Sequence, residues 1–289
     1  MRISRIFALV VVLCVATVTV GSLSAQGTGK LRFGVGPLQP TPTETKKAYE
    51  PFFAYLAKGL DRDFDLVATT DWAGISVALA NGQVDLAWMG PWGYVLAHDD
   101  SGVVAIATAK YDGKPIYHAI VICKPGLVKS WPDGAKGKRV SFADVGSTSG
   151  WLIPTFYAME VWKIDPKTYW KYSEGATHAA NEIAVSSGQV DMATDFDRNR
   201  NAMIASGKVK EDSNKIIWTS APLPNDAIAV PAAAKELGAQ VQRILTAITV
   251  EQAKTLLPPR YTGFVPATHA SYETIEKAGI AVGKIKARA

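Results

Sequence analysis

The sequence is poor in cysteine, with only two among its 289 residues. Cys14 lies in the apolar run near the N-terminus, so Cys123 is the only cysteine in the rest of the chain. One cysteine cannot form an internal disulfide, and the fold must therefore depend on its hydrophobic core. About 260 residues follow the N-terminal run, which is enough for two domains with a buried core each.

The excess of one sign of charge is also small, since 31 basic and 26 acidic residues give a net charge of +5. Two of the basic residues, Arg2 and Arg5, precede the N-terminal apolar run, which leaves 29 against 26 in the rest of the chain. No basic run is interleaved with aromatic residues. We therefore expect no nucleic-acid partner.

Only one long hydrophobic run is present, Ile6–Val20, and it follows the basic segment Met1–Arg5. A run of this length is short for a membrane span and is typical of a secretory signal peptide. Small residues between positions 22 and 25 place the expected cleavage near residue 25. We expect residues 1–25 to be removed and the mature protein to be soluble in the periplasm.

Motifs of two catalytic classes are missing. A serine-hydrolase nucleophile elbow has the pattern G-x-S-x-G, but the central residue of Gly146–Gly150 is Thr148. An exported serine hydrolase that uses Ser147 or Ser149 with His178 is thus only an alternative. The four histidines include no pair at close ligand spacing, which argues against a metal receptor or metalloenzyme. We expect a protein that is not an enzyme and that holds no cofactor or metal.

The chain does contain an alternation of strand-like and helical segments. Its first half predicts strands at residues 31–36, 64–68 and 84–88 and helices at 43–60 and 72–80, with Asp71 as an N-cap. This order favours an α/β domain with a largely parallel sheet, which binds ligands beyond the carboxyl ends of its strands. Trp72 and Gly90–Tyr94 follow strands and are expected at that rim.

The second half repeats this organisation. A strand at 139–143 opens a second unit, and Gly188-Gln189-Val190-Asp191 repeats Gly82-Gln83-Val84-Asp85, which predicts two similar lobes. We expect the chain to leave the first lobe on a strand at 116–123 and to return near 223–226, after a strand at 215–219. Helices at 233–253 and from 272 would finish on that lobe. The expected divisions are 28–123 and 221–289 for the first lobe and 124–220 for the second.

Three hydroxyl residues, Ser147, Thr148 and Ser149, stand between Gly146 and Gly150 and run directly into an apolar, helix-like segment. The first amides of a helix have no partner within the helix and lie at the positive end of its dipole, so they can hold an anion. Flanking glycines let the backbone approach a ligand closely. The alternative is an ordinary N-cap with a polar first turn.

These segments resemble the solute-binding proteins of phosphonate and phosphite ABC transporters. The resemblance is carried, in order along the chain, by Asp71–Ile75, Gly82–Pro91, Ser147–Pro154, Gly175–His178 and Gly188–Asp191. It implies a type II periplasmic binding protein fold: two lobes, each a mixed sheet flanked by helices, with the ligand in the cleft between them. Gly90–Tyr94, Gly150-Trp151 and Leu223–Asp226 look most like the branch that takes hypophosphite and phosphite.

The resemblance also implies a set of ligand-binding residues. Ser147, Thr148 and Ser149 would bind phosphoryl oxygens, Tyr117 would meet them from the other lobe, and His178 would add a donor.

Other residues would shape the remainder of the pocket. Trp72 and Tyr94 would form an aromatic wall, and Trp92 would narrow the space. Asp226 would accept a hydrogen bond from a P–OH group or a ligand ammonium. Asp195 and Asp197 could extend an acidic cluster for an amine, but Arg198 and Trp92 disfavour an amine pocket. We favour the interpretation that Asp195 and Asp197 belong to a solvated loop.

The expected function is that of an exported, monomeric binding component of an ABC importer. It would capture a small phosphorus oxyanion, such as phosphite, hypophosphite or methylphosphonate, by lobe closure and deliver it to a membrane permease with its ATPase. An aminoalkyl phosphonate, a sulfonate or another tetrahedral oxyanion is the alternative ligand.

Overall fold

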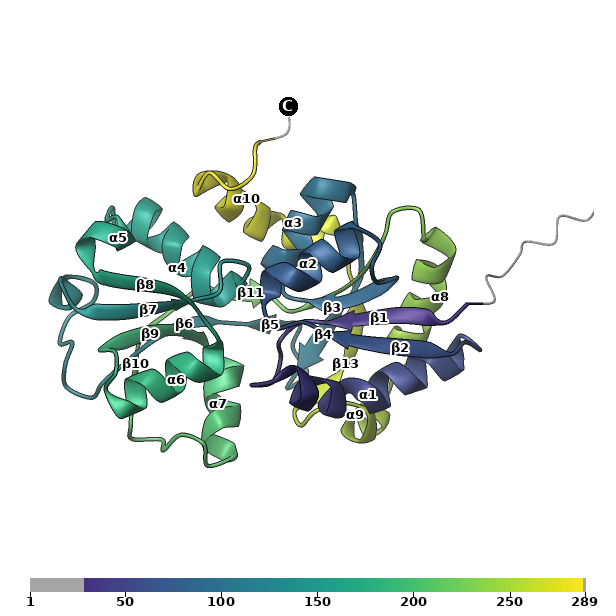
Figure 1. Cartoon of the computed structure of the whole chain (residues 1–289), viewed down its shortest axis with the longest axis horizontal. Helices are drawn as coiled ribbons and strands as arrows, with labels where there is room; N and C mark the ends of the chain where they lie inside the picture. The colour runs from purple at the N-terminus through teal and green to yellow at the C-terminus, as the bar shows by residue number, and fades with distance from the viewer. Residues whose placement is uncertain (1–28, 288–289) are drawn as a thin grey trace, which may run out of the picture.

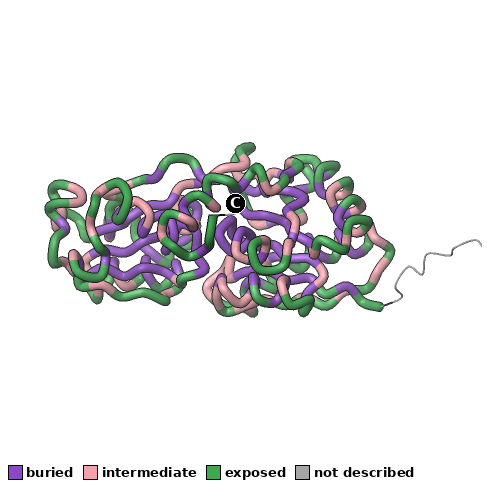
Figure 2. The backbone as a smooth tube through the Cα atoms, turned by 90° about the horizontal axis from the view of Figure 1, so that it is seen from above, coloured by how far each residue is buried: buried purple, intermediate pink, exposed green. Residues whose placement is uncertain are grey.

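A computed structural model describes residues 29–287 of the chain. The expected signal peptide lies outside the described residues. Two sheets, each with helices on both faces, form two lobes (Figure 1). Buried residues occupy the centre of each lobe (Figure 2). Among residues 29–287, no helix combines the length and the apolar character needed to cross a membrane.

The sheet of the first lobe is mixed. Its six strands lie in the order β13-β4-β12-β3-β1-β2. β1 pairs in parallel with β2 and β3, as the sequence predicts, whereas β12 and β13 pair antiparallel with their neighbours. The strands are β1 (Leu31–Val35), β2 (Phe64–Ala68), β3 (Leu86–Met89), β4 (Val104–Tyr111), β12 (Ala227–Val230) and β13 (Tyr261–Pro266).

The five-stranded sheet of the second lobe repeats this arrangement in the order β10-β6-β9-β7-β8. β7 is parallel to β8 and β9, and β6 is antiparallel to β9 and β10. Each lobe therefore has a parallel triplet extended by antiparallel strands. The strands are β6 (Ala119–Cys123), β7 (Arg139–Ala143), β8 (Lys171–Ala176), β9 (Met192–Phe196) and β10 (Lys215–Thr219).

The helices cover both faces of each sheet. In the first lobe, α1 (Pro42–Gly59), α8 (Lys235–Thr246) and α9 (Val250–Leu256) share one face, and α2 (Trp72–Ala80) and α3 (Pro91–Ser101) share the other. In the second lobe, α6 (His178–Ser187) and α7 (Asp197–Ala205) lie opposite a helical run of η2 (Thr148–Leu152), α4 (Ile153–Phe156) and η3 (Tyr157–Val161), which α5 (Pro166–Tyr169) follows. The short η1 (Asp133–Ala135) and η4 (His269–Tyr272) complete the set.

Two expectations about the C-terminal helices need correction. The helix expected at 233–253 is two helices, because the capping box of Thr249 and Gln252 starts α9 anew. The tail helix α10 (Glu273–Ala281) does not rest on the first lobe alone. It contacts α3 of the first lobe and α4 of the second, above the junction in Figure 1.

The repeated Gly-Gln-Val-Asp turns have the same structural role in both lobes. Asp85 accepts the backbone N–H of Arg32 at 2.8 Å and pairs with its guanidinium at 2.6 Å. Asp191 accepts the backbone N–H of Arg139 at 2.8 Å and pairs with its guanidinium at 2.7 Å. Each aspartate thus fastens the turn before the third parallel strand to the start of the central one.

The lobes are joined by a two-stranded ribbon in which β5 (Ile116–Tyr117) pairs antiparallel with β11 (Leu223–Pro224). The return near 223–226 therefore lies where the sequence predicts it. The outward crossing lies nearer His118 than Cys123, because β6 is already a member of the second sheet. Tyr117 and Asp226 consequently stand at the base of the cleft.

Candidate functional site

A small cavity lies between the lobes. All six strands of the two parallel triplets point their carboxyl ends at it, and each is followed by a residue that lines it. The residues that follow β1, β2, β3, β7, β8 and β9 are, respectively, Leu38, Trp72, Gly90, the Ser147–Ser149 loop, His178 and Arg198. The position of the cavity is the one that parallel α/β sheets favour.

The hydroxyl loop begins the helical run of the second lobe. Ser147 is the N-cap, and its Oγ accepts the N–H of Gly150 at 3.0 Å. The amides of Thr148 and Ser149 occupy the first turn, where a helix has no acceptor of its own to offer. Ser147, Thr148 and Ser149 are each 3% exposed and line the cavity. The loop is therefore a helix cap and also a set of donors aimed at an enclosed space.

Two glycines of this loop allow close approaches that a side chain would block. A Cβ on Gly150 would stand 2.7 Å from Cε1 of His178. A Cβ on Gly146 would stand 2.5 Å from the backbone nitrogen of Ala73, in the first turn of α2 across the cleft. Gly150 thus admits the histidine, and Gly146 lets the two lobes meet.

His178 connects the loop to a buried carboxylate. Its Nε2 lies 2.8 Å from Ser147 Oγ, and its Nδ1 lies 2.9 Å from Asp195 Oδ1. Burial lowers the pKa of His178 to about 4, so its ring is neutral near pH 7. Burial also raises the pKa of Asp195 to about 7, although Glu182 and Asn199 act in the opposite direction through hydrogen bonds.

Glu182 is a second buried carboxyl group, next to Asp195 in the second lobe. It is fully buried in α6, and Asn214 donates to its Oε2 at 2.7 Å. Burial and the neighbouring Asp195 raise its pKa to about 9. The carboxyl group is therefore protonated near neutral pH. The second lobe thus avoids the energetic cost of a second buried negative charge beside Asp195.

Arg198 is a buried cation in the cavity wall that the sequence reasoning did not place in the site. It is 6% exposed, and Nη2 lies 3.5 Å from Asp226 Oδ2 across the lobes. Burial opposes its charge, but Tyr261 and Asp226 outweigh that effect and hold the pKa of Arg198 above its ordinary value. The signal was available, since Arg198 directly follows a strand that ends at the rim. Arginine is seldom buried, so the sequence reasoning did not expect Arg198 in the wall of a buried cavity.

Asp226 and Tyr117 come from the ribbon that joins the lobes. Asp226 accepts from Trp88 Nε1 at 3.2 Å in addition to its pairing with Arg198. Burial raises the pKa of Tyr117, and the hydroxyls of Thr148 and Ser149 act in the opposite direction. Tyr117 therefore faces the hydroxyl loop as a neutral phenol, and the charge of Asp226 is balanced within the protein.

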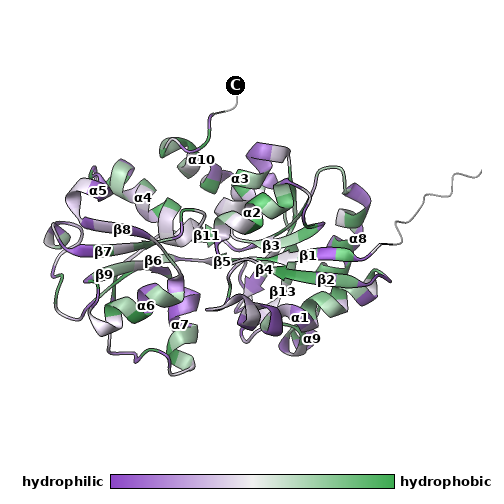
Figure 3. Cartoon of the chain, viewed as in Figure 1, coloured by the Kyte–Doolittle hydropathy of each residue, from purple (hydrophilic) through white to green (hydrophobic). Residues whose placement is uncertain are grey.

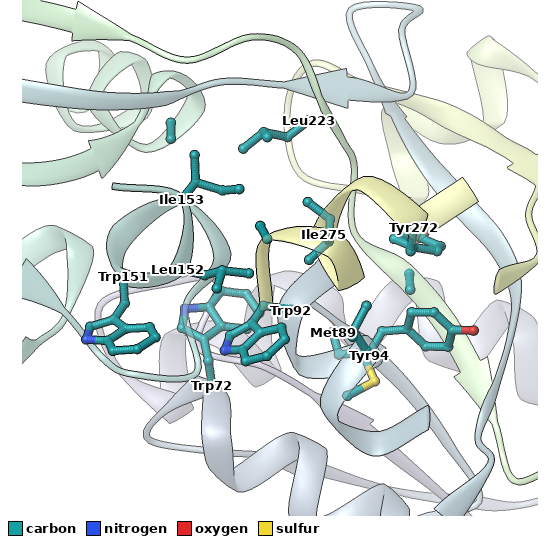
Figure 4. Packing of buried hydrophobic residues seen from close by; sticks show 14 of the residues in the cluster. Trp72, Met89, Trp92, Tyr94, Trp151, Leu152, Ile153, Leu223, Tyr272 and Ile275 are labelled. Atoms are coloured by element: carbon teal, nitrogen blue, oxygen red, sulfur yellow. The ribbon is translucent and has the colours of Figure 1, made fainter. Parts of the chain in front are cut away.

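Two of the predicted site residues do not line the cavity. Trp92 is part of the contact between the lobes: its backbone N–H donates to Thr148 Oγ1 at 2.7 Å, and its indole N–H donates to Val145 O at 3.2 Å. Tyr94 points away from the cleft, packs on Tyr272 and lies 3.2 Å from His269 Nδ1 through its hydroxyl. Figure 4 shows Trp92 beside Trp72, with Tyr94 on the far side of the cluster. Helix α3 turns both side chains away from the rim.

The solvated-loop interpretation of Asp195 and Asp197 holds for only one of them. Asp195 is fully buried in β9, where it accepts from Asn199 at 3.0 Å and lies 2.9 Å from His178 Nδ1. Asp197 is partly exposed at the start of α7 and pairs with His118 at 3.1 Å. Neither lines the cavity. The sequence reasoning also missed Phe196 and Leu38, which line it.

Ser147, His178 and Asp195 are linked by hydrogen bonds in the manner of a hydrolase triad, but other features of a hydrolase are missing. Ser147 Oγ is already the acceptor for the N–H of Gly150 and is buried in a cap, where a nucleophile needs exposure at a strained turn. Within residues 29–287, no three His, Cys, Asp or Glu side chains are grouped so that they could hold a metal ion.

Comparison with known proteins identifies the family. The family model of the periplasmic substrate-binding proteins of phosphonate ABC transporters matches residues 33–272. The chain is 31% identical over 203 residues to the phosphonates-binding periplasmic protein of Escherichia coli K12, covering 68% of this chain and 60% of that protein. It is 26% identical over 264 residues to the phosphate-import protein PhnD of Mycolicibacterium smegmatis, covering 81% of this chain and 80% of that protein.

Solved structures share the fold. A binding protein component of an ABC phosphonate transporter from Pseudomonas aeruginosa superimposes with a TM-score of 0.79 at 23% identity, over 88% of this chain and 87% of that one. PhnD1 of Prochlorococcus marinus, in complex with methylphosphonate, gives 0.78 at 17% identity, over 89% and 100%. Both have the type II periplasmic binding protein architecture seen here, and the matched family consists of substrate-binding components of transporters. The chain belongs to the family of periplasmic substrate-binding proteins of phosphonate ABC transporters.

Proposed function

We propose that this protein captures a small phosphorus oxyanion in the inter-lobe cavity and presents it to the permease and ATPase of an ABC importer. Phosphite, hypophosphite and methylphosphonate are the proposed ligands. The observation that carries the proposal is the convergence of Ser147, Thr148, Ser149 and Tyr117, all buried, on one small cavity between the lobes. Hydroxyl and amide donors at a helix start are the groups that a tetrahedral oxyanion requires.

Several contacts bridge the lobes and favour a closed form. Asp144 accepts the N–H of Trp72 at 3.1 Å, Trp92 donates to Thr148, and Arg198 pairs with Asp226. The polar lining residues are all less than a tenth exposed, so ligand exchange requires the lobes to separate. A ligand held by both lobes shifts this equilibrium toward closure, and closure is the signal that a permease can recognise.

The ligand would be held mainly by the second lobe. The amides of Thr148 and Ser149 would meet two oxygens of the ligand, and the hydroxyl of Tyr117 would approach from the ribbon. Each hydrogen bond to a charged group contributes about 1.5–3 kcal/mol, so three or four, offset by desolvation and association costs, are consistent with micromolar or tighter binding. Trp72 would close the apolar side of the site.

We further propose that the mature protein is a periplasmic monomer, exported by a signal peptide that ends near residue 25. An aminoalkyl ligand is a weaker candidate. Arg198 stands in the cavity wall, where an ammonium group would meet a like charge.

Isothermal titration calorimetry of residues 26–289 tests the proposal. Hypophosphite, phosphite, methylphosphonate, 2-aminoethylphosphonate, phosphate and sulfate form the ligand set. We expect at least one of the first three to bind more tightly than phosphate, sulfate and 2-aminoethylphosphonate. No heat with any phosphorus ligand would refute the proposal, and a preference for sulfate would assign the site to another tetrahedral oxyanion.

A further inference from the structure

A second and larger cavity adjoins the one described above. It has a volume of about 430 Å³ and lies between the loop after β1, helix α7 and the loop before β13. Leu38, Phe196 and Arg198 line both cavities and form the wall between them. A substituent on a phosphorus atom bound in the inner cavity would therefore meet the side of Arg198 that both cavities share.

The outer cavity has cationic and no anionic lining residues. Three of its lining side chains, Arg198, Lys208 and Arg260, are basic, and no aspartate or glutamate of residues 29–287 lines it. Lys208 and Arg260 are already paired, with Glu44 and Asp112 respectively. Arg198 is the cation at its inner end, in the first turn of α7, the part of that helix that is coloured hydrophilic in Figure 3.

Arg198 retains hydrogen-bonding capacity that the described residues do not use. Its Nη1 donates to the Tyr261 hydroxyl at 3.3 Å, and Nη2 approaches Asp226 at 3.5 Å. Its Nε is buried and has no partner among residues 29–287. A buried N–H without an acceptor is costly, and an anionic ligand group can supply the missing one.

The guanidinium is also held firmly in place. Its carbon lies 4.8 Å from the ring centroid of Tyr117, 5.4 Å from those of Tyr111 and Phe196, and 5.7 Å from that of Tyr261. Aromatic faces stabilise a buried cation and restrict its motion. The free donor is thus presented in a fixed direction, which suits recognition of a planar carboxylate.

We propose that Arg198 and the outer cavity form a subsite for an anionic substituent, so that the protein binds carboxyalkyl phosphonates in preference to neutral or amino-substituted ones. This inference rests on the proposed function, because it places the phosphoryl group in the inner cavity. The smaller ligands named above occupy that inner cavity alone. The carboxylate of the longer ones accepts from Arg198 Nε, whereas an ammonium at the same place meets a like charge.

Calorimetry with a matched set of phosphonates tests the subsite. 2-Carboxyethylphosphonate and its neutral isostere 2-carbamoylethylphosphonate differ only in the charged group, and 2-aminoethylphosphonate reverses the charge. We expect the carboxylate to bind at least about tenfold more tightly than the amide, and the amine to bind more weakly than both. Equal affinity of carboxylate and amide, in a protein that binds methylphosphonate, would overturn this inference and leave the proposed function intact.

Variants of Arg198 show whether that residue sets the preference. In Arg198→Gln, paired with Asp226→Asn so that no unpaired charge is buried, the ratio of carboxylate to amide affinity should fall to about one. Arg198→Lys keeps the positive charge but lacks the planar guanidinium and its fixed N–H donors. It should retain part of the carboxylate-to-amide affinity ratio. Arg200→Gln is the control, because Arg200 lies on the same helix but bonds to Asn214, and it should keep the full ratio.

Two further outcomes of these titrations would contradict the inference. If the double variant weakens methylphosphonate by the same factor as 2-carboxyethylphosphonate, Arg198 belongs to the phosphoryl site and the inference is wrong. If the wild-type protein gives no heat with any phosphonate, the inference is wrong, and the proposed function fails with it only if phosphite and hypophosphite also give no heat. Thermal unfolding of each variant separates loss of binding from loss of fold.

Discussion

The Ser147 hydroxyl oxygen lies 2.8 Å from Nε2 of His178, between the loop that follows β7 and the first residue of α6. Since the other ring nitrogen lies 2.9 Å from Asp195, the proton on the neutral ring has two possible positions. With the proton on Nδ1, His178 donates to ionised Asp195 and accepts from Ser147. With it on Nε2, His178 accepts from protonated Asp195 and frees the Ser147 O–H for a ligand.

Binding of an oxyanion should therefore be linked to proton uptake. The second arrangement supplies one more donor to the cavity and requires a protonated Asp195, whose pKa is about 7. Affinity should increase as the pH falls through about 7, with uptake of up to about one proton per ligand. Hypophosphite is the suitable ligand because its single acidic group does not titrate in this range. Titrations at pH 7 in two buffers of different ionisation enthalpy measure the uptake, and Asp195→Asn should abolish it. Buffer-independent heats for the wild-type protein would contradict this linkage.

Thr148→Ala and His178→Ala should each weaken binding of the preferred oxyanion by about 1 kcal/mol or more, since each removes a group that donates to, or orients a donor toward, a charged ligand. Calorimetry measures the change. Thr246→Ala is the matched control, because the Thr246 hydroxyl is bonded within exposed helix α8. Unchanged affinity in both test variants would remove Thr148 and His178 from the site.

Gly146→Ala should hold the lobes apart. The added Cβ would lie 2.5 Å from the Ala73 backbone nitrogen and 2.8 Å from the Trp72 carbonyl carbon, both in the opposite lobe. Because backbone atoms cannot move aside, we expect a larger radius of gyration in the presence of ligand and binding at least about tenfold weaker. Small-angle X-ray scattering and calorimetry measure the two effects. Gly29→Ala, whose Cβ would contact nothing within 4 Å, should match the wild type. Normal closure of the Gly146 variant would show that the contact is not needed.

Stability should decrease as the pH rises from 7 to 9, because of Glu182. Its folded-state pKa of about 9 is above the ordinary value of 4.5, so the folded state binds more protons than the unfolded state in this interval. The loss has a limiting slope of about 1.4 kcal/mol per pH unit. His178 does not contribute there, since its pKa is below 7 in both states. Denaturant unfolding at several pH values should show a flatter dependence for Glu182→Gln, and parallel curves would refute the assignment.

Local features of the sequence predicted most of the fold. The cap at Asp71, the repeated Gly-Gln-Val-Asp turns and the apolar strands each depend on neighbouring residues, and all have the expected structure. The lobe crossing was misplaced because strand character continues through 116–123, although the residues on either side of His118 belong to different sheets.

The sequence predicted which residues line the cavity where a residue follows a parallel strand, but not where a side chain's direction depends on packing. That the lining residues bind a ligand stays a prediction. Trp92 and Tyr94 follow β3 as expected, yet α3 directs Trp92 toward Gly279 of α10 and the second lobe, and Tyr94 toward His269 and Tyr272. Arg198 shows the opposite failure. Its burial depends on four aromatic rings and Asp226, which come from segments far apart in the chain. No local sequence pattern predicts that these groups surround Arg198.

The position of α10 determines where this protein can be modified. The described chain ends beside a helix that touches both lobes, and Lys284 lies over the Trp151 ring of the second lobe, 5.0 Å from its centroid. A bulky group attached to α10 would therefore lie beside the contact between the lobes, which must open for ligand exchange. The start of β1 lies at the far edge of the first lobe in Figure 1, so the N-terminal end of the mature chain is the better attachment point for surface immobilisation. A reporter dye on the last turn of α10 would instead be placed where relative motion of the lobes alters its surroundings most.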